Sequence, residues 1–150
     1  MPAFITCGRV LFAVWFIYSG ATKLFAIQAS ADASAAAVPI PEVLAPYTAQ
    51  LEAMAGMPTA QVIAIVAGAF EVIAGLMIAL NFGTRLFALL LIIFIALVTY
   101  YFHDFWDQAA PDNAKTLVDA LKNLSLIGAL FVIAGLGRGR KAAEGAYADI

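Results

Sequence analysis

The chain has 150 residues, of which 64% are hydrophobic and only 12% are charged, and its formal net charge is −2. An ordinary soluble domain is about 45–50% apolar and about 25% charged, so this composition excludes a typical soluble fold and indicates an integral membrane protein. The single cysteine and the single histidine exclude an internal disulfide, a dithiol redox centre and a four-ligand zinc site.

The apolar runs predict four helices that cross a bilayer, because a crossing needs about 20 mostly apolar residues. The predicted spans cover residues 4–27, 59–80, 84–102 and 117–136. The expected fold is therefore an all-α membrane protein, an up-down-up-down four-helix transmembrane bundle that forms one domain over 1–150. We expect the first span to be retained rather than cleaved as a signal peptide, because Arg9 lies inside its apolar run.

The long connection over residues 28–58 is rich in Ala, Pro and Ser and has two interpretations. Leu44, Tyr47, Leu51 and Met54 have helical spacing, which predicts a short amphipathic helix on the outer face or over the mouth of the bundle. A disordered loop is the alternative.

The distribution of basic residues predicts that both termini are cytoplasmic, since Lys and Arg gather on the inner side of a membrane. With four predicted spans, the inner side carries five basic residues and the outer side carries three. The inner set is Arg9, Arg85, Arg138, Arg140 and Lys141, and the outer set is Lys23, Lys115 and Lys122. So few basic residues, placed in this way, do not predict nucleic-acid binding.

Glu71 lies near the middle of the second span, where an exposed carboxylate costs several kcal/mol. Gly68 and Gly75 share its helical face and allow another helix or a ligand to approach closely. Glu71 is either a proton-linked or ligand-binding carboxylate or a packing partner of a lysine or of hydroxyl groups. Lys23, at the outer end of the first span, is the natural partner; its ammonium either turns toward Glu71 or extends to the membrane surface.

The stretch YYFHDFWDQ contains the only histidine, His103, at the outer end of the third span. Tyr and Trp gather where bilayer meets water, so an aromatic belt is one interpretation. Lys122 and Asn123 lie near the start of the fourth span, as hydrogen-bond donors or as interface anchors. Polar groups from all four spans thus converge on the outer half of the membrane, which predicts an outward polar pocket rather than a channel.

Four segments of the chain resemble, in order, the DoxX family of small four-span membrane proteins: GRVLFAVWFIYSGATKL, GAFEVIAGLMIALNFGTRLFALLL, TYYFHDFW and LKNLSLIGALFVIAGLGRGR. The resemblance implies a compact bundle in the bacterial cytoplasmic membrane. It also implies a redox context, because a related subunit belongs to thiosulfate:quinone oxidoreductase and other relatives accompany thiol and superoxide defence enzymes. The matching positions are Arg9, Gly20, Lys23, Glu71, Gly75, Arg85, His103, Phe105, Trp106, Lys122 and Asn123.

The leading hypothesis is a membrane subunit of a quinone-linked oxidoreductase, not catalytic alone, that binds a quinone-like or thiol/sulfur substrate in the outer-half pocket. Glu71 and His103 would act as the catalytic proton-handling residues. The expected substrate-binding residues, which would hold a carbonyl or anion or stack on a ring, are Lys23, Tyr100, Phe105, Trp106, Lys122 and Asn123. The sequence has no motif for an intrinsic cofactor, so electrons would come from a redox partner protein.

Two alternatives remain open at this point. The chain could be a non-catalytic scaffold or assembly partner for another enzyme, with the polar cluster holding the helices in register. It could also be a small transport or metal-handling subunit in which His103, Asp104, Asp107 and Glu71 contact a divalent ion, although no metal site is predicted. Membrane lipid is an expected partner in each case, and a second copy of the chain is a further option.

Overall fold

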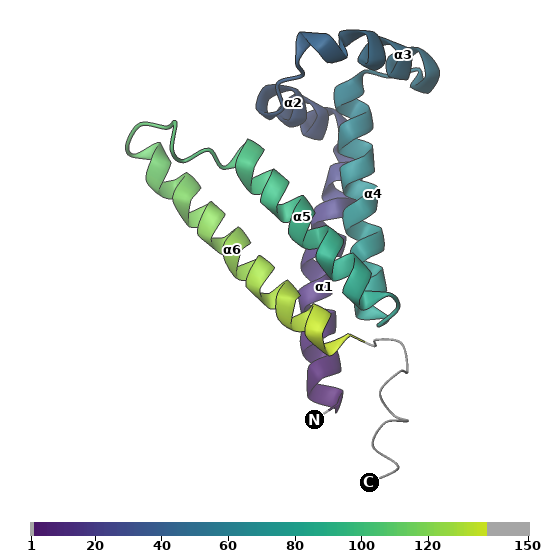
Figure 1. Ribbon diagram of the computed structural model, residues 1–150, viewed down its shortest axis with the longest axis vertical. Coiled ribbons are helices and arrows are strands. Elements are labelled where there is room, and N and C mark those ends of the chain that lie inside the picture. The colour runs from purple at the N-terminus through teal and green to yellow at the C-terminus, as the bar shows by residue number, and fades with distance from the viewer. Residues whose placement is uncertain (1, 138–150) are drawn as a thin grey trace. The chain divides into compact units, whose positions relative to one another are not determined.

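The computed structural model describes residues 2–137, and all regular structure in that range is helical. The predicted all-α fold class is therefore confirmed for this part of the chain (Figure 1). In chain order the elements are α1 (Pro2–Phe25), α2 (Ile27–Ala37), the short 3-10 helix η1 (Glu42–Leu44), α3 (Ala45–Ala55), α4 (Thr59–Ala79), α5 (Thr84–Phe102) and α6 (Asp112–Leu136).

Four of these helices are long and apolar enough to cross a membrane, as the sequence predicts. They cover Ala3–Phe25, Thr59–Ala79, Thr84–Phe102 and Asp112–Leu136. The last one begins at Asp112 rather than near residue 117, because its first turn is polar and hydropathy alone does not reveal it. The cytoplasmic position of the termini stays a prediction, and Arg138, Arg140 and Lys141, on which it partly rests, lie outside the described residues.

The connection over residues 28–58 is mostly helical rather than extended. Helix α3 contains Tyr47, Leu51 and Met54, whose side chains are exposed. It ends at Gly56, whose φ of 68° is the left-handed conformation that commonly terminates helices. Helix α2 has no counterpart among the predicted elements, although its sequence IQASADASAAA is dominated by alanine, the strongest helix former.

The described chain comprises two compact units. The first unit, Phe12–Gly75, contains most of α1 and α4 together with α2, η1 and α3. The second unit combines the described residues up to Leu11 with those from Leu76 onward, and it contains α5 and α6. The prediction of one domain over 1–150 stays a prediction.

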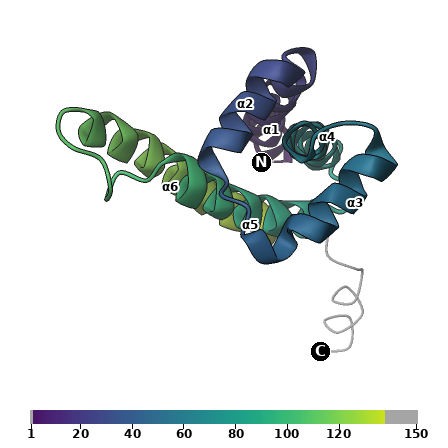
Figure 2. The ribbon, with the colours of Figure 1, turned by 90° about the horizontal axis from the view of Figure 1, so that it is seen from above.

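In the first unit, α1 and α4 run beside each other, as the view along both helices shows (Figure 2). The segment 27–58 leaves the end of α1 and returns to the start of α4. Its two ends are close together, because Gln61 of α4 donates a 3.1 Å side-chain hydrogen bond to Gln28 of α2. The segment is therefore a largely helical insertion between two membrane spans.

In the second unit, α5 and α6 lie side by side along their length (Figure 1). Ala88, Leu91 and Ile95 of α5 are buried, as are Ala120 and Leu130 of α6. The connection between α5 and α6 contains His103, Phe105 and Trp106.

Candidate functional site

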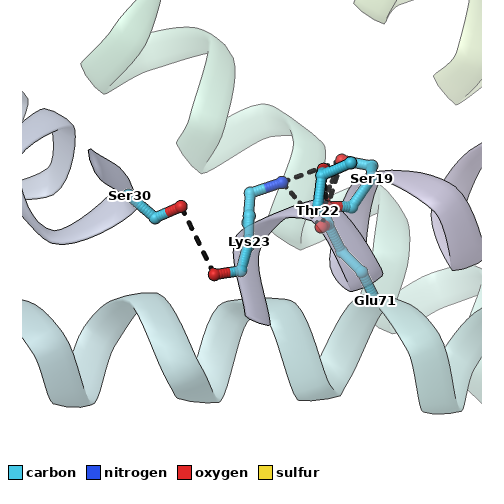
Figure 3. Close-up of polar contacts among 5 residues, drawn as sticks. All are labelled: Ser19, Thr22, Lys23, Ser30 and Glu71. Carbon is cyan, nitrogen blue, oxygen red and sulfur yellow. Dashed lines mark hydrogen bonds and ion pairs between the residues drawn. The ribbon is translucent and has the colours of Figure 1, made fainter. Parts of the chain in front are cut away.

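The first cluster of polar side chains joins α1 to α4 (Figure 3). Lys23 Nζ lies 2.7 Å from Glu71 Oε2 and donates a hydrogen bond to it. Nζ also donates to Ser19 Oγ at 2.8 Å, and Ser19 Oγ donates to Glu71 Oε2 at 3.2 Å. Of the two positions considered for Lys23, the structure therefore shows the inward one.

Glycines bring the two helices close enough for these side chains to meet. A Cβ atom on Gly20 would collide with the backbone oxygen of Gly68 and would lie 2.9 Å from the Cβ of Glu71. A Cβ on Gly68 would lie 2.9 Å from the backbone oxygen of Gly20. Ser19 and Lys23 are four residues apart and share one face of α1, so both reach Glu71.

The charges in this cluster neutralise each other within an apolar environment. Glu71 is only 5% exposed, and the Lys23 side chain is 32% exposed. An unpaired charge at this depth would be costly, and a direct ion pair with additional hydrogen bonds offsets the loss of hydration. The arrangement holds α1 and α4 in a fixed register.

The second cluster is an aromatic crevice in the second unit, between α5 and α6. It has a volume of about 310 Å³ and is lined by Ala96, Thr99, Tyr100, Trp106, Ala120, Leu124 and Ile127. The rings of Tyr100 and Trp106 have centroids 5.8 Å apart and are tilted by 34°. Phe105 packs edge-on against Trp106 at 5.1 Å. Three of the predicted aromatic residues thus gather at the C-terminal end of α5.

Asn123 forms the polar edge of this region. Its Nδ2 donates a 3.0 Å hydrogen bond to Thr99 Oγ1, which in turn donates to the backbone oxygen of Ile95 at 2.7 Å. Because Thr99 lines the crevice, this bond fixes α6 against α5 beside it. Thr99 is absent from the predicted site, although a threonine at the polar end of an apolar helix is a signal for such a bond.

The hydrogen bonds of Lys122 and His103 are local ones. Lys122 donates to Asp119 of its own helix at 2.9 Å, and its side chain is 68% exposed. His103 follows the last residue of α5, where its backbone N–H donates to the oxygen of Thr99 at 3.1 Å. Its imidazole is half-buried. Neither residue is anchored to the aromatic crevice by a side-chain hydrogen bond within residues 2–137.

The predicted site residues therefore fall into two groups. Lys23 and Glu71 meet in the first unit, while Tyr100, Phe105 and Trp106 gather in the second unit. The convergence of all four spans on one pocket stays a prediction. Between residues 2 and 137, no group of three His, Cys, Asp or Glu side chains could hold a metal ion.

Comparisons with known proteins agree with the membrane fold. The family model described as DoxX matches residues 4–104. The inner membrane protein YphA of Escherichia coli (strain K12) is 33% identical over 92 residues, which are 61% of this chain and 66% of that protein. The chain thus spans slightly less than two thirds of its relative's length. No solved structure matches the chain.

The family match divides the predicted site residues. Lys23, Glu71, Tyr100 and His103 lie inside the matched range 4–104. Phe105, Trp106, Lys122 and Asn123 lie beyond it, as does all of α6. The paired carboxylate and the histidine therefore belong to the part of the chain that the family shares.

Proposed function

The chain belongs to the DoxX family of membrane proteins, and from this membership we propose that it is a multi-pass inner-membrane subunit of a redox system that binds a quinone-like ring in the crevice between α5 and α6. The inner-membrane location is supported by the name of its relative and by the four apolar helices. A redox partner protein supplies the electrons, since quinone chemistry needs an electron source that this sequence does not encode.

The aromatic crevice is the observation that carries the proposal. Its volume of about 310 Å³ is at the lower end of the range of about 300–1,000 Å³ for small-molecule sites. A quinone has a flat ring, polar carbonyl oxygens and a hydrocarbon tail. Tyr100 and Trp106 offer ring faces and polar hydrogens, while Ala96, Leu124 and Ile127 offer apolar walls. Because α5 and α6 both span the membrane, the tail would stay in the lipid.

His103 is the proposed proton-handling residue of the second unit. This residue lies at the same end of α5 as Tyr100, and an imidazole can both accept and donate a proton in catalysis. Reduction of a quinone to a quinol takes up protons as well as electrons, so a titratable group near the ring would serve it. Glu71 is the second proposed proton-handling residue; it lies in the first unit, where it is paired with Lys23.

A ring substrate suits the crevice better than a thiol or a sulfur oxyanion does. The residues that line the crevice include no lysine or arginine to hold an anion. Lys122, the predicted anion-binding residue of α6, donates instead to Asp119. Phe105 supports the aromatic wall through its edge contact with Trp106.

The two tryptophans of the chain provide a direct test. Trp15→Phe leaves Trp106 as the only tryptophan, and Trp106→Phe leaves Trp15. Titration with decyl-ubiquinone in neutral detergent should quench the fluorescence of Trp106 to a saturating level. The fluorescence of Trp15 should fall only linearly, because the quinone also dissolves in the detergent micelle. Ala120→Leu in the Trp15→Phe background should weaken the saturable phase by filling the crevice. Equal quenching of the two single-tryptophan variants would overturn the proposal. So would the absence of a saturable phase, both in the protein with His103 intact and in the His103→Ala variant.

A second candidate function, the non-catalytic scaffold, is favoured by the geometry around Glu71. Every polar group in the Lys23, Ser19 and Glu71 cluster has a partner within the chain, and glycines on both helices allow close packing. A scaffold predicts that Glu71→Gln lowers the yield of an assembled complex but leaves redox activity per complex unchanged. The metal-handling alternative gains no such support, because its candidate ligands do not gather within the described residues.

A further inference from the structure

A second cavity lies where the segment 27–58 returns to the membrane. It has a volume of about 340 Å³ and lies in the first unit, between the end of α2, the following extended residues and the first turn of α4. The lining residues that matter here are Ser34, Val38, Ile40, Glu52, Thr59 and Ile63. Thr59 is the first residue of a helix that is long and apolar enough to cross a membrane. We therefore expect this cavity, which we call the insert pocket, to lie where bilayer meets water.

Hydrogen bonds hold Glu52 in a fixed position in the insert pocket. Its Oε1 accepts from the backbone N–H of Thr59 at 2.8 Å and from the Thr59 hydroxyl at 2.9 Å. These bonds, the backbone one first, lower the pKa of Glu52 below its ordinary value, so the carboxylate is charged at neutral pH. Within the part of the chain that the structure describes, Oε2 accepts no hydrogen bond and remains available.

The two hydroxyl groups of the pocket, those of Ser34 and Thr59, already donate their hydrogen atoms to acceptors within the protein. The Thr59 hydroxyl donates to Glu52, and the Ser34 hydroxyl donates to the backbone oxygen of Ser30 at 2.8 Å. Ser34 and Thr59 are each only 7% exposed, so water does not readily replace a missing partner there. What these groups still offer is acceptor capacity: lone pairs on two hydroxyl oxygens and a free carboxylate oxygen. Such a set recognises a ligand with several N–H donors.

The charge of the segment 27–58 and the apolar wall of the insert pocket indicate which class of ligand would bind there. Residues 27–58 include Asp32, Glu42 and Glu52 but no Lys, Arg or His, so the segment attracts cations and repels anions. The rest of the pocket wall includes Val38, Ile40 and Ile63, which favour hydrocarbon. A ligand that satisfies both parts has a positively charged head and an apolar body.

We propose that the insert pocket binds an amphiphilic organic ammonium ion. Its N–H groups donate to Glu52 Oε2 and to the hydroxyl oxygens of Ser34 and Thr59, and its hydrocarbon part lies against Val38, Ile40 and Ile63. The site goes beyond the proposed quinone function and does not depend on it. The ammonium group comes either from a free alkylamine or from the headgroup of an aminophospholipid, and the two sources share this recognition chemistry.

Calorimetric titration of the full-length protein in neutral detergent with n-hexylammonium tests the proposal. Saturable binding is expected, and 1-hexanol, which has no charge, should bind more weakly. Glu52→Gln should weaken hexylammonium binding roughly tenfold, because it removes a charge-assisted hydrogen bond. The matched control is Glu42→Gln, which removes the same charge from the same segment outside the pocket and should leave the affinity unchanged. Equal losses in the two variants, or no saturable binding of hexylammonium, would overturn the proposal.

A second variant separates binding from local folding. Ala35→Leu adds bulk to the pocket wall but leaves Glu52 and its two hydrogen bonds to Thr59 in place. It should weaken hexylammonium binding while the thermal unfolding midpoint stays that of the wild type. Unchanged affinity in Ala35→Leu would place the cation elsewhere and would contradict the proposal.

The source of the ammonium is identified in lipid nanodiscs. With phosphatidylcholine alone, whose headgroup has no N–H donor, hexylammonium should bind as it does in detergent. If phosphatidylethanolamine occupies the pocket, its addition should weaken the apparent affinity for hexylammonium in the wild type but not in Glu52→Gln. Unaltered affinity in the wild type would support a free amine as the ligand.

Discussion

At the scale of single residues, Glu71 shows how an apolar membrane helix accommodates a carboxylate. Its partners come from one face of α1, where Ser19 and Lys23 are four residues apart. The sequence alone suggests the pairing of Lys23 with Glu71, because few cations lie at a similar depth. It does not assign Ser19 the bridging position that the structure shows. Only the packing of α1 on α4 determines which hydroxyl reaches the carboxylate.

Glu71→Gln should destabilise the protein much more than the loss of an exposed ion pair does. The substitution leaves the Lys23 ammonium without its counter-charge, and loss of one partner from a buried pair costs about 3–5 kcal/mol. Because the Lys23 side chain is 32% exposed, we expect about 2–4 kcal/mol. Unfolding in mixed detergent and dodecyl sulfate, followed by far-ultraviolet circular dichroism, measures this difference.

The control for that experiment is Asp119→Asn, which breaks the pair between Lys122 and Asp119. Both side chains of this pair are substantially exposed, at 68% and 36%, so its loss should destabilise the protein much less than Glu71→Gln does. If both variants lost the same stability, the Glu71 pair would be no more important than a surface contact.

At the scale of helices, glycines determine which faces of α1 and α4 meet. Gly68→Ala should destabilise the protein by about 1–3 kcal/mol, since overpacking of a tight contact has this cost. The added methyl group would lie 2.9 Å from the backbone oxygen of Gly20, which cannot move independently of its helix. The same detergent unfolding experiment gives the value.

Gly128→Ala in α6 is the matched control for Gly68→Ala. A Cβ at Gly128 has no neighbour within 4 Å, so the substitution should be neutral or should stabilise the helix by up to about 1 kcal/mol. A similar loss in both variants would mean that a general cost of alanine, rather than the α1–α4 contact, is responsible.

The junction between α3 and α4 should be sensitive to acid. Glu52 has a lowered pKa in the folded protein because it accepts hydrogen bonds from Thr59. A lowered folded pKa means that the carboxylate stabilises the junction above its unfolded pKa, and that this contribution is lost as pH falls through the folded value. Hydrogen exchange at the Thr59 amide, corrected for its intrinsic pH dependence, should show protection that declines as the pH falls below the ordinary pKa of a glutamate.

Glu52→Gln should remove most of this acid dependence at Thr59, because an amide does not titrate. Glu42→Gln should retain it, since Glu42 lies in η1 and makes no bond to Thr59. Acid-dependent protection that persists in Glu52→Gln would show that another group controls the junction.

At the scale of the whole molecule, hydropathy is enough to locate the four spans, because long apolar runs have no other stable environment in a chain of this composition. It does not predict α2, whose alanines are compatible with loop or helix. The sequence also does not predict which residues line the aromatic crevice. Thr99 and Trp106 come from α5 and its following loop, whereas Ala120 and Leu124 come from α6. The rotation of two helices about their axes, which tertiary packing determines, decides that these residues face one another.

The predicted topology, with both termini cytoplasmic, can be tested by cysteine labelling in intact cells. Cys7→Ser provides a background without cysteine. Ala33→Cys, in exposed α2, should react with a membrane-impermeant maleimide added outside, once the outer membrane is made permeable. Phe82→Cys, in the exposed α4–α5 turn, should react only after the cells are lysed. The reverse pattern would invert the topology.

The hydrogen bond between Gln28 and Gln61 has a consequence for the engineering of this chain. It shows that the two ends of the segment 27–58 are close enough for two glutamine side chains to join them. A short linker could therefore join the end of α1 to the start of α4 without moving either helix. The segment 27–58 is in this sense a removable module. A chain shortened in this way should keep the Lys23–Glu71 pair and lose the insert pocket, so the two sites can be gained or lost independently.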